Sequence, residues 1–277
     1  MTDTLVYNVP VRLVDRYPGR DLIVRSAVPA EIAECASIDL LPRVRFAQLP
    51  STPSDISPLE PWGTGVPIDI VLSDPAVDFV RLYNYATLKE THPVRVTVPV
   101  IEAGFSKAVR LAVALGFAVR LSPGQPDALL IEELSGVLDF YLHNAKVQQP
   151  IEFFQTMLRS FYQPQAISMW EINEEDPAQV RYVTDDGEET ISRRFAGRVP
   201  AVELHNFVYH FGEQLLVEKG ECFACDFYSR CHGFFKWPNK SYSCKGVKSL
   251  FMTMQSAAAD LQTDLKSFAA VSGDRRP

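Results

Sequence analysis

Four of the five cysteines of this chain lie close together, and they are the residues with the clearest chemical potential. Cys222, Cys225, Cys231 and Cys244 follow the spacing C-x2-C-x5-C-x12-C. A tight turn between the first two would aim both sulfurs at one ion or cluster. Four thiolates suit tetrahedral zinc or the four irons of a [4Fe–4S] cluster. The sequence therefore predicts a soft-metal site at these four cysteines.

The surroundings of the cysteines favour a [4Fe–4S] cluster over zinc. Zinc ribbons and knuckles usually carry two short cysteine pairs, whereas this segment has one. Aromatic side chains, which exclude water from a cluster and tune its potential, are dense here. They are Phe223, Phe227, Tyr228, Phe234, Phe235, Trp237 and Tyr242. A structural zinc site and reduced thiols without metal are the alternatives.

Other candidate residues have simpler interpretations. Cys35 is far from the other cysteines and is interpreted as a small buried hydrophobic residue. His232 follows Cys231, but four thiolates already complete a shell. A basic group near the hairpin is interpreted as a solvated face, with contact to an acidic leader peptide as the alternative. It consists of Arg193, Arg194 and Arg198.

The bulk composition limits the classes of function. The chain has 277 residues, of which 47% are hydrophobic and 22% charged, so it should fold around a substantial core. The net charge of −7 argues against a nucleic-acid partner, because phosphate binding needs clustered cations. No apolar run is long enough to cross a membrane, and no signal-like segment is present. We therefore expect a cytoplasmic protein, in which reduced cysteines can bind metal.

The hydrophobic pattern predicts an α/β fold. From Pro67, strand-like runs alternate with helix-like runs, so the strands should lie parallel in a partial (β/α) barrel or an open sheet. The predicted strands are Asp21–Val28, Arg43–Leu49, Ile68–Leu72, Val94–Ile101 and Phe117–Leu121. The predicted helices are Pro29–Ser37, one that starts at Asp74 and ends before His92, Ser106–Leu115, Pro126–Leu142 and Pro150–Tyr162.

The pattern changes in the last third of the chain. A strand at Ala166–Ile172 and an acidic loop at 173–176 are expected to precede a hairpin at Gln179–Ser192. Helices are predicted at Val199–Glu218 and Val247–Phe268. We accordingly divide the chain into a degenerate partial-barrel domain, 1–165, and a cysteine-rich domain, 166–277.

The cysteine segment resembles the SPASM region of radical S-adenosylmethionine (SAM) peptide-modifying enzymes. That family carries C-x2-C-x5-C-x3-C followed by a last cysteine, and Cys222, Cys225, Cys231 and Cys244 match the first three positions and the last. In the family these four cysteines hold the second auxiliary [4Fe–4S] cluster. The resemblance therefore implies a SPASM-like module with the same cluster here, preceded by a barrel that has lost its first unit.

Three departures from the family pattern affect the expected activity. Phe235 stands at the fourth cysteine of the C-x3-C spacing, and Ser192 stands where the upstream hairpin should carry a cysteine. The triplet C-x3-C-x2-C that holds the SAM-cleaving cluster is missing from the chain. The resemblance therefore implies that this chain does not cleave SAM by itself.

These observations lead to one main functional hypothesis and two alternatives. The main hypothesis is an iron–sulfur accessory protein that works with a maturase subunit or a precursor peptide in peptide or natural-product modification. The first alternative is a stand-alone metalloenzyme with substrate at the carboxyl ends of the parallel strands. The second is a zinc-stapled protein-interaction module. Catalytic residues are not predicted, and enzymatic activity is left open.

Overall fold

One open sheet of nine strands runs through the computed structural model, which describes residues 5–35, 40–163, 167–195 and 204–273. The strand order is β7-β6-β5-β4-β3-β2-β1-β8-β9, and all neighbours are parallel except the antiparallel hairpin β8–β9. The strands are β1 Val6–Pro10, β2 Asp21–Arg25, β3 Val44–Leu49, β4 Ile68–Val71, β5 Val94–Pro99, β6 Ala118–Ser122, β7 Ile151–Glu152, β8 Val180–Val183 and β9 Glu189–Thr190. The prediction of an α/β fold with an open parallel sheet is thus confirmed.

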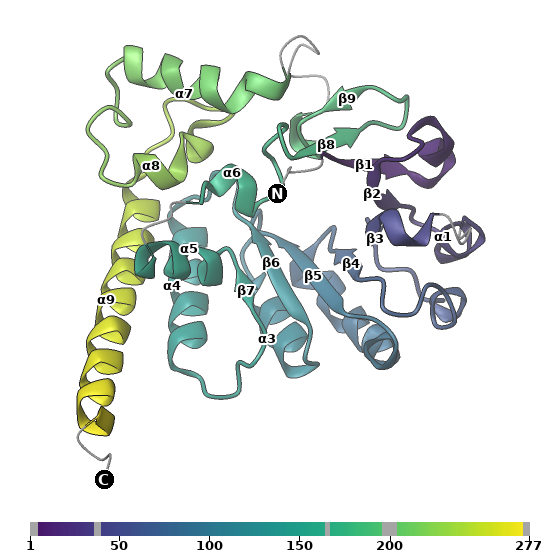
Figure 1. Ribbon diagram of the computed structural model, residues 1–277, viewed down its shortest axis with the longest axis horizontal. Helices are drawn as coiled ribbons and strands as arrows, with labels where there is room; N and C mark the ends of the chain where they lie inside the picture. The colour runs from purple at the N-terminus through teal and green to yellow at the C-terminus, as the bar shows by residue number, and fades with distance from the viewer. Residues whose placement is uncertain (1–4, 36–39, 164–166, 196–203, 274–277) are drawn as a thin grey trace.

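Helices connect most of these strands, and the last ones extend beyond the sheet (Figure 1). The α-helices are α1 Pro29–Glu34, α2 Pro75–Asp78, α3 Ser106–Ala114, α4 Ala128–His143, α5 Phe154–Tyr162, α6 Met169–Ile172, α7 Phe207–Val217, α8 Tyr228–Cys231 and α9 Lys245–Gly273. The 3-10 helices are η1 Val11–Arg16, η2 Leu41–Arg43, η3 Ser57–Leu59, η4 Phe79–Glu90, η5 Arg193–Phe195, η6 Leu204–Asn206 and η7 Phe234–Lys236. The long helix α9 packs against α4 and α5.

The two faces of the sheet differ in polarity, as β5 shows. Val94, Val96 and Val98 alternate with Arg95 and Thr97, so the valines point to one face and the polar residues to the other. All three valines are buried, and α3 packs on β5 and β6. Burial of this apolar face under helices is the main hydrophobic stabilisation of the sheet.

The predicted strands from Asp21 to Leu121 are all present, with ends that differ by a few residues. The sequence analysis missed β1. Because β1, β2 and β3 pair in parallel, the sheet begins well before Pro67. It also missed β7, which replaces the start of the helix predicted at Pro150. The helix predicted from Asp74 is divided into the short α2 and the 3-10 helix η4, with the Asp74 carboxylate capping α2.

The prediction of a strand at Ala166–Ile172 is wrong. Ala166 lies outside the described residues, and Met169–Ile172 forms α6. Ser168 and Glu171 form a capping box that satisfies the first backbone N–H groups of this helix, which outweighs the strand-like composition. The Gln179–Ser192 hairpin is confirmed as β8–β9. Of the predicted helix Val199–Glu218, residues 199–203 lie outside the described part, and the rest forms η6 and α7.

The fully buried side chain of Trp170 in α6 joins the cysteine-bearing segment to the sheet region. Its indole N–H donates to the carbonyl oxygen of His232 at 3.0 Å. Its ring packs on Phe234 and Phe211, with centroids 5.1 and 6.2 Å apart. The carbonyl oxygen of Pro126 accepts a hydrogen bond of 2.6 Å from the Tyr242 hydroxyl, which adds a second attachment.

The division into domains at residue 165 stays a prediction. Strand β8, from the second predicted domain, pairs with β1 at Val6, Tyr7 and Asn8 and so continues the sheet of the first. Among the helices in the described part of the chain, none combines the length and the apolar character needed to span a membrane.

Replacing Trp170 tests the attachment of the cysteine segment. Because Trp170 is fully buried, Trp170→Ala should lower the free energy of unfolding by about 3–5 kcal/mol. Urea denaturation followed by circular dichroism measures this change. Tyr209→Ala is the matched control, because the Tyr209 ring is 66% exposed on α7 and its loss should cost less than about 0.5 kcal/mol. Equal effects of the two substitutions would contradict this assignment.

Candidate functional site

The four clustered cysteines line a single small cavity. Cys222 and Cys244 are buried, and Cys225 and Cys231 are partly buried. The remaining lining is aromatic and aliphatic, with three charged residues at one side. It consists of Glu221, Phe227, Tyr228, Phe235, Lys236, Val247, Lys248 and Phe251. The structure thus brings together four thiols that are up to 22 positions apart, since the cysteines run from 222 to 244.

Short turns position these cysteines. The amide of Cys225 donates to the carbonyl oxygen of Cys222 at 3.3 Å, so the C-x2-C pair forms one turn. Cys231 is the last residue of α8, and Cys244 directly precedes α9. The amide of Lys248 donates to the carbonyl oxygen of Cys244 at 2.8 Å, which holds that cysteine against the helix start.

A left-handed turn after α8 aims backbone N–H groups at the Cys231 sulfur. His232 and Gly233 have φ of 47° and 75°. The amides of Gly233 and Phe235 then lie in hydrogen-bonding position to Cys231. Backbone donors of this kind stabilise a thiolate, and they tune the potential of iron–sulfur clusters.

Gly233 also meets a packing requirement. A Cβ atom at this position would lie 2.3 Å from Cδ1 of Leu215, whose side chain is buried in α7. Glycine is therefore needed both for the positive φ and for the close approach of the turn to α7.

Three charged side chains form an ion-pair cluster at the cavity wall. Nζ of Lys236, a buried lysine, donates to Oε2 of Glu221 at 2.7 Å, and Nζ of Lys248 lies 3.0 Å from Oε1. Burial alone would raise the pKa of Glu221, but its hydrogen bonds from Lys236, the Cys244 amide and Lys248 lower the pKa to about 2. The carboxylate is therefore ionised, and the cluster carries one net positive charge beside the thiols.

Burial also affects the thiols themselves. It raises the pKa of both Cys231 and Cys244 to about 12, and neighbouring cysteines add to the shift. Without metal these thiols are protonated at neutral pH. Metal binding must therefore release protons, as it does at other thiolate sites.

The cavity fits a thiolate-bound group in its donor set. Four cysteine sulfurs, two N–H donors to one of them and two lysines favour a group with net negative charge. In the described part of the chain, no three His, Cys, Asp or Glu side chains are placed to hold one metal ion. A [4Fe–4S] cluster does not require such a group around one ion, because each thiolate binds its own iron.

The other residues singled out in the sequence lie elsewhere. His232 stacks on Tyr228, and its Nε2 lies 2.9 Å from the carbonyl oxygen of Ser229, outside the cavity lining. Phe235, at the position of the missing family cysteine, lines the cavity. Cys35 lines a separate cavity near the ends of β1–β3. Ser192 donates to Oε1 of Glu175 at 3.0 Å, near the polar face of the sheet.

A second candidate site, which the sequence analysis missed, covers this polar face. Arg25, Gln48, Asp69 and Arg95 stand in register on β2, β3, β4 and β5, one residue from each strand. Thr97 and Arg120 form a second registered pair on β5 and β6. The signal was visible as polar residues inside otherwise apolar strands, which is unusual for a parallel sheet covered on both faces.

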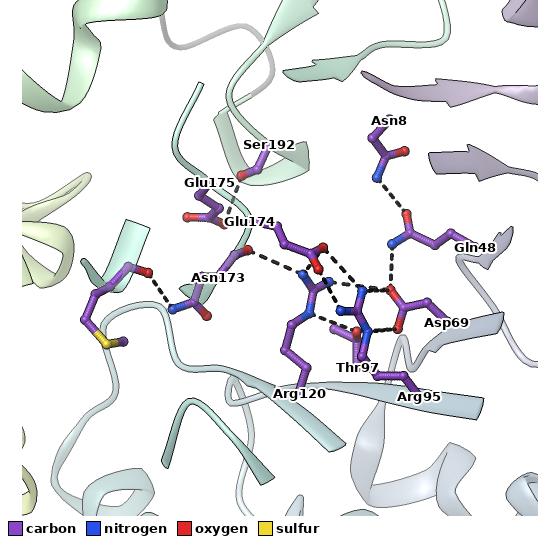
Figure 2. A network of polar contacts seen from close by, with 11 residues as sticks. Asn8, Gln48, Asp69, Arg95, Thr97, Arg120, Asn173, Glu174, Glu175 and Ser192 are labelled. Atoms are coloured by element: carbon purple, nitrogen blue, oxygen red, sulfur yellow. Dashed lines mark hydrogen bonds and ion pairs between the residues drawn. The ribbon is translucent and has the colours of Figure 1, made fainter. Parts of the chain in front are cut away.

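Asp69 is the centre of this polar face (Figure 2). Its fully buried carboxylate accepts hydrogen bonds from Thr97 at 2.7 Å, from Gln48 at 2.9 Å and from Arg95 at 3.0 and 3.2 Å. Burial alone would raise its pKa, but Arg95 and Arg120 outweigh burial and hold the pKa well below the usual range. Asp69 is therefore a permanent buried anion.

Glu174 completes the network from the loop after α6. Its carboxylate pairs with Arg95 at 2.6 Å and with Arg120. Burial raises its pKa, and the two arginines lower the pKa below the ordinary value by a larger amount. Two arginines and two carboxylates thus neutralise one another. The acidic loop predicted at 173–176 is present, and its Glu174 lies on the sheet.

A cavity of about 570 Å³ opens above this network, a size typical of small-molecule sites. Comparison with models of known protein families, with curated proteins and with solved structures found no match to this chain. The functional argument therefore depends on the two sites themselves.

Replacing Asp69 tests the buried network. Asp69→Asn leaves two arginines undercompensated and should lower the free energy of unfolding by about 3–5 kcal/mol at pH 7. The folded pKa of Asp69 is depressed, so its stabilisation is complete above the unfolded pKa of about 3.9 and is lost as the pH falls below that value. The variant should therefore lose less stability than the wild type between neutral pH and pH 3. Urea denaturation across this range measures both effects.

The control for this test is Asp260→Asn, which removes an exposed carboxylate from α9. It should change stability by less than about 0.5 kcal/mol. An Asp69→Asn protein as stable as this control would contradict the proposed role of the buried anion.

Replacing Gly233 tests the turn beside Cys231. Gly233→Ala combines a positive φ with a contact of 2.3 Å, so it should cost about 2 kcal/mol or more. Gly136→Ala is the matched control, because Gly136 lies within α4 with open space around it, and the substitution should stabilise the protein by about 0.5–1 kcal/mol. Thermal unfolding measures both values, and effects of the same sign would contradict this interpretation.

Proposed function

We propose that the chain is an iron–sulfur protein in which Cys222, Cys225, Cys231 and Cys244 hold one [4Fe–4S] cluster. The observation that supports this most strongly is the convergence of all four thiols on one cavity. Aromatic side chains at the cavity wall would limit access of water, and the two lysines would offset negative charge.

When bound, such a cluster supplies one-electron transfer and a covalent cross-link between segments of the fold. The chain's own residues would hold it in a SPASM-like manner: the C-x2-C turn presents two thiolates, and the left-handed turn supplies N–H donors to a third. The fourth thiolate, Cys244, is held by the start of α9.

We further propose that this protein supports a separate radical SAM maturase, or its precursor peptide, in the cytoplasm. This role follows from the resemblance of the cysteine spacing together with the missing SAM-cluster triplet. In this hypothesis the chain stabilises, docks or supplies electrons to a partner, and the partner cleaves SAM.

Anaerobic purification followed by iron and sulfide analysis tests the cluster. The full chain should contain about four irons and four sulfides, with broad visible absorbance and an EPR signal after reduction. Cys222→Ala, Cys225→Ala, Cys231→Ala and Cys244→Ala should each lose most of the bound iron. Cys35→Ala is the matched control and should retain it, because Cys35 lies outside the cavity.

Other outcomes distinguish the alternatives. A colourless protein with one zinc per chain, lost in the same four variants, would overturn the iron–sulfur proposal and support the zinc-stapled module. A protein that binds neither metal under anaerobic reconstitution would leave the four thiols as core residues and overturn both.

A further inference from the structure

The carboxyl ends of β1, β2 and β3 carry a second, unassigned pocket. Two adjoining cavities of about 570 and 780 Å³ share Arg25, Pro50, Tyr182 and Arg193 in their walls. Crevices outside the carboxyl ends of parallel strands are common ligand sites in open α/β sheets. The hairpin β8–β9 adds Tyr182 to the walls of both cavities, from strand β8, which pairs with β1.

Arg25 is buried at this position with part of its hydrogen-bonding capacity unused. Its side chain is only 6% exposed, and Nη1 donates to the carbonyl oxygen and to Oδ1 of Asn8 at 2.7 and 2.9 Å. Nη2 donates once, to the carbonyl oxygen of Val183. An arginine has five N–H donors, so Nε–H and one Nη2–H have no hydrogen-bond partner among the described residues.

Arg193 is a second guanidinium in the same pocket. It is exposed, lines both cavities and is close enough to Arg25 for electrostatic repulsion. It forms no hydrogen bond or ion pair with another residue in the described ranges. Two cationic guanidinium groups in the walls of one pocket, one of them buried, attract an anion.

The carboxylates nearby compensate this charge only in part. Asp185 is 3.9 Å from Arg25, but its side chain is 75% exposed and it is also 3.7 Å from Arg12. The Arg12–Asp185 pair is exposed on both sides and contributes little. Glu31 accepts a hydrogen bond from Ser26, and Glu34 is exposed at the edge of the pocket. Of the carboxylates further inside, Glu174 is neutralised by Arg95 and Arg120, and Glu175 accepts a hydrogen bond from Ser192.

The 570 Å³ cavity extends from Arg25 to the loop after α6. Oδ1 of Asn173 is buried without a hydrogen-bond partner, while its Nδ2 donates to the carbonyl oxygen of Met169 at 2.9 Å. Asn173 lines the same 570 Å³ cavity as Arg25. This oxygen is enclosed by protein, so the groups that a ligand can reach in the pocket are the guanidinium donors of Arg25 and Arg193.

We infer that this pocket binds an oxyanion, a carboxylate or a phosphate group of a small ligand, between Arg25 and Arg193. The planar guanidinium groups match both oxyanions with paired N–H donors. This inference is independent of the cysteine site, and neither would fail with the other.

An NMR titration of the full chain tests it, in a buffer free of phosphate and carboxylate. The probes are inorganic phosphate, N-acetylglycine and the neutral N-acetylglycinamide, and the readout is the amide signals of Ser26 and Tyr182. At least one oxyanion should give saturable shifts, and the neutral amide should give none. Arg193→Gln should raise the dissociation constant about ten-fold, and Arg193→Lys should have a smaller effect because it keeps the charge.

The control is Lys107→Gln, which removes one exposed positive charge from α3, away from the pocket. It should change the dissociation constant by less than about two-fold. Binding of phosphate alone would assign the site to phosphate-bearing ligands, and binding of N-acetylglycine alone to carboxylates. Equal binding by Arg193→Gln and wild type, equal binding of the neutral amide, or no binding of either oxyanion would overturn the inference.

Discussion

The buried carboxylate of Asp69 is the constraint on which much of the structure depends. A charge in this position is tolerated only if cations and donors surround it. The neighbouring strands provide Gln48, Arg95 and Thr97, and all of them contact the carboxylate directly. Because two arginines then need a second anion, Glu174 must also dock on the sheet. Charge balance thus determines where the chain passes after α6.

The same short segment links both candidate sites. Trp170 packs on the aromatic residues of the cysteine region, and four positions later Glu174 pairs with the arginines of the sheet. Neither contact can be satisfied if α6 is displaced. The cysteine cavity therefore has a defined position relative to the polar face, although the two share no lining residues.

Local patterns explain which elements could be predicted. The strands around Ile70, Val96 and Val119 have apolar runs of strand length bounded by turn residues, and they form as expected. Strand β1 was missed because Val6–Pro10 is short and ends in proline, so its pairing with β2 and β8 is specified by neighbours rather than by its own composition. The segment ending at Ile172 has the composition of a strand, yet the Ser168–Glu171 capping box makes it a helix.

The sequence by itself determined the fold class and the identity of the four candidate ligands, because hydrophobic periodicity and cysteine spacing are local properties. Only the tertiary structure decided that the four thiols line one cavity beside Lys236 and Lys248. It also decided that Arg25, Asp69 and Arg120, which look like isolated polar residues in apolar strands, form one face. The physical reason is register: side chains from different strands become neighbours only when backbone pairing aligns them, and no single strand encodes that alignment.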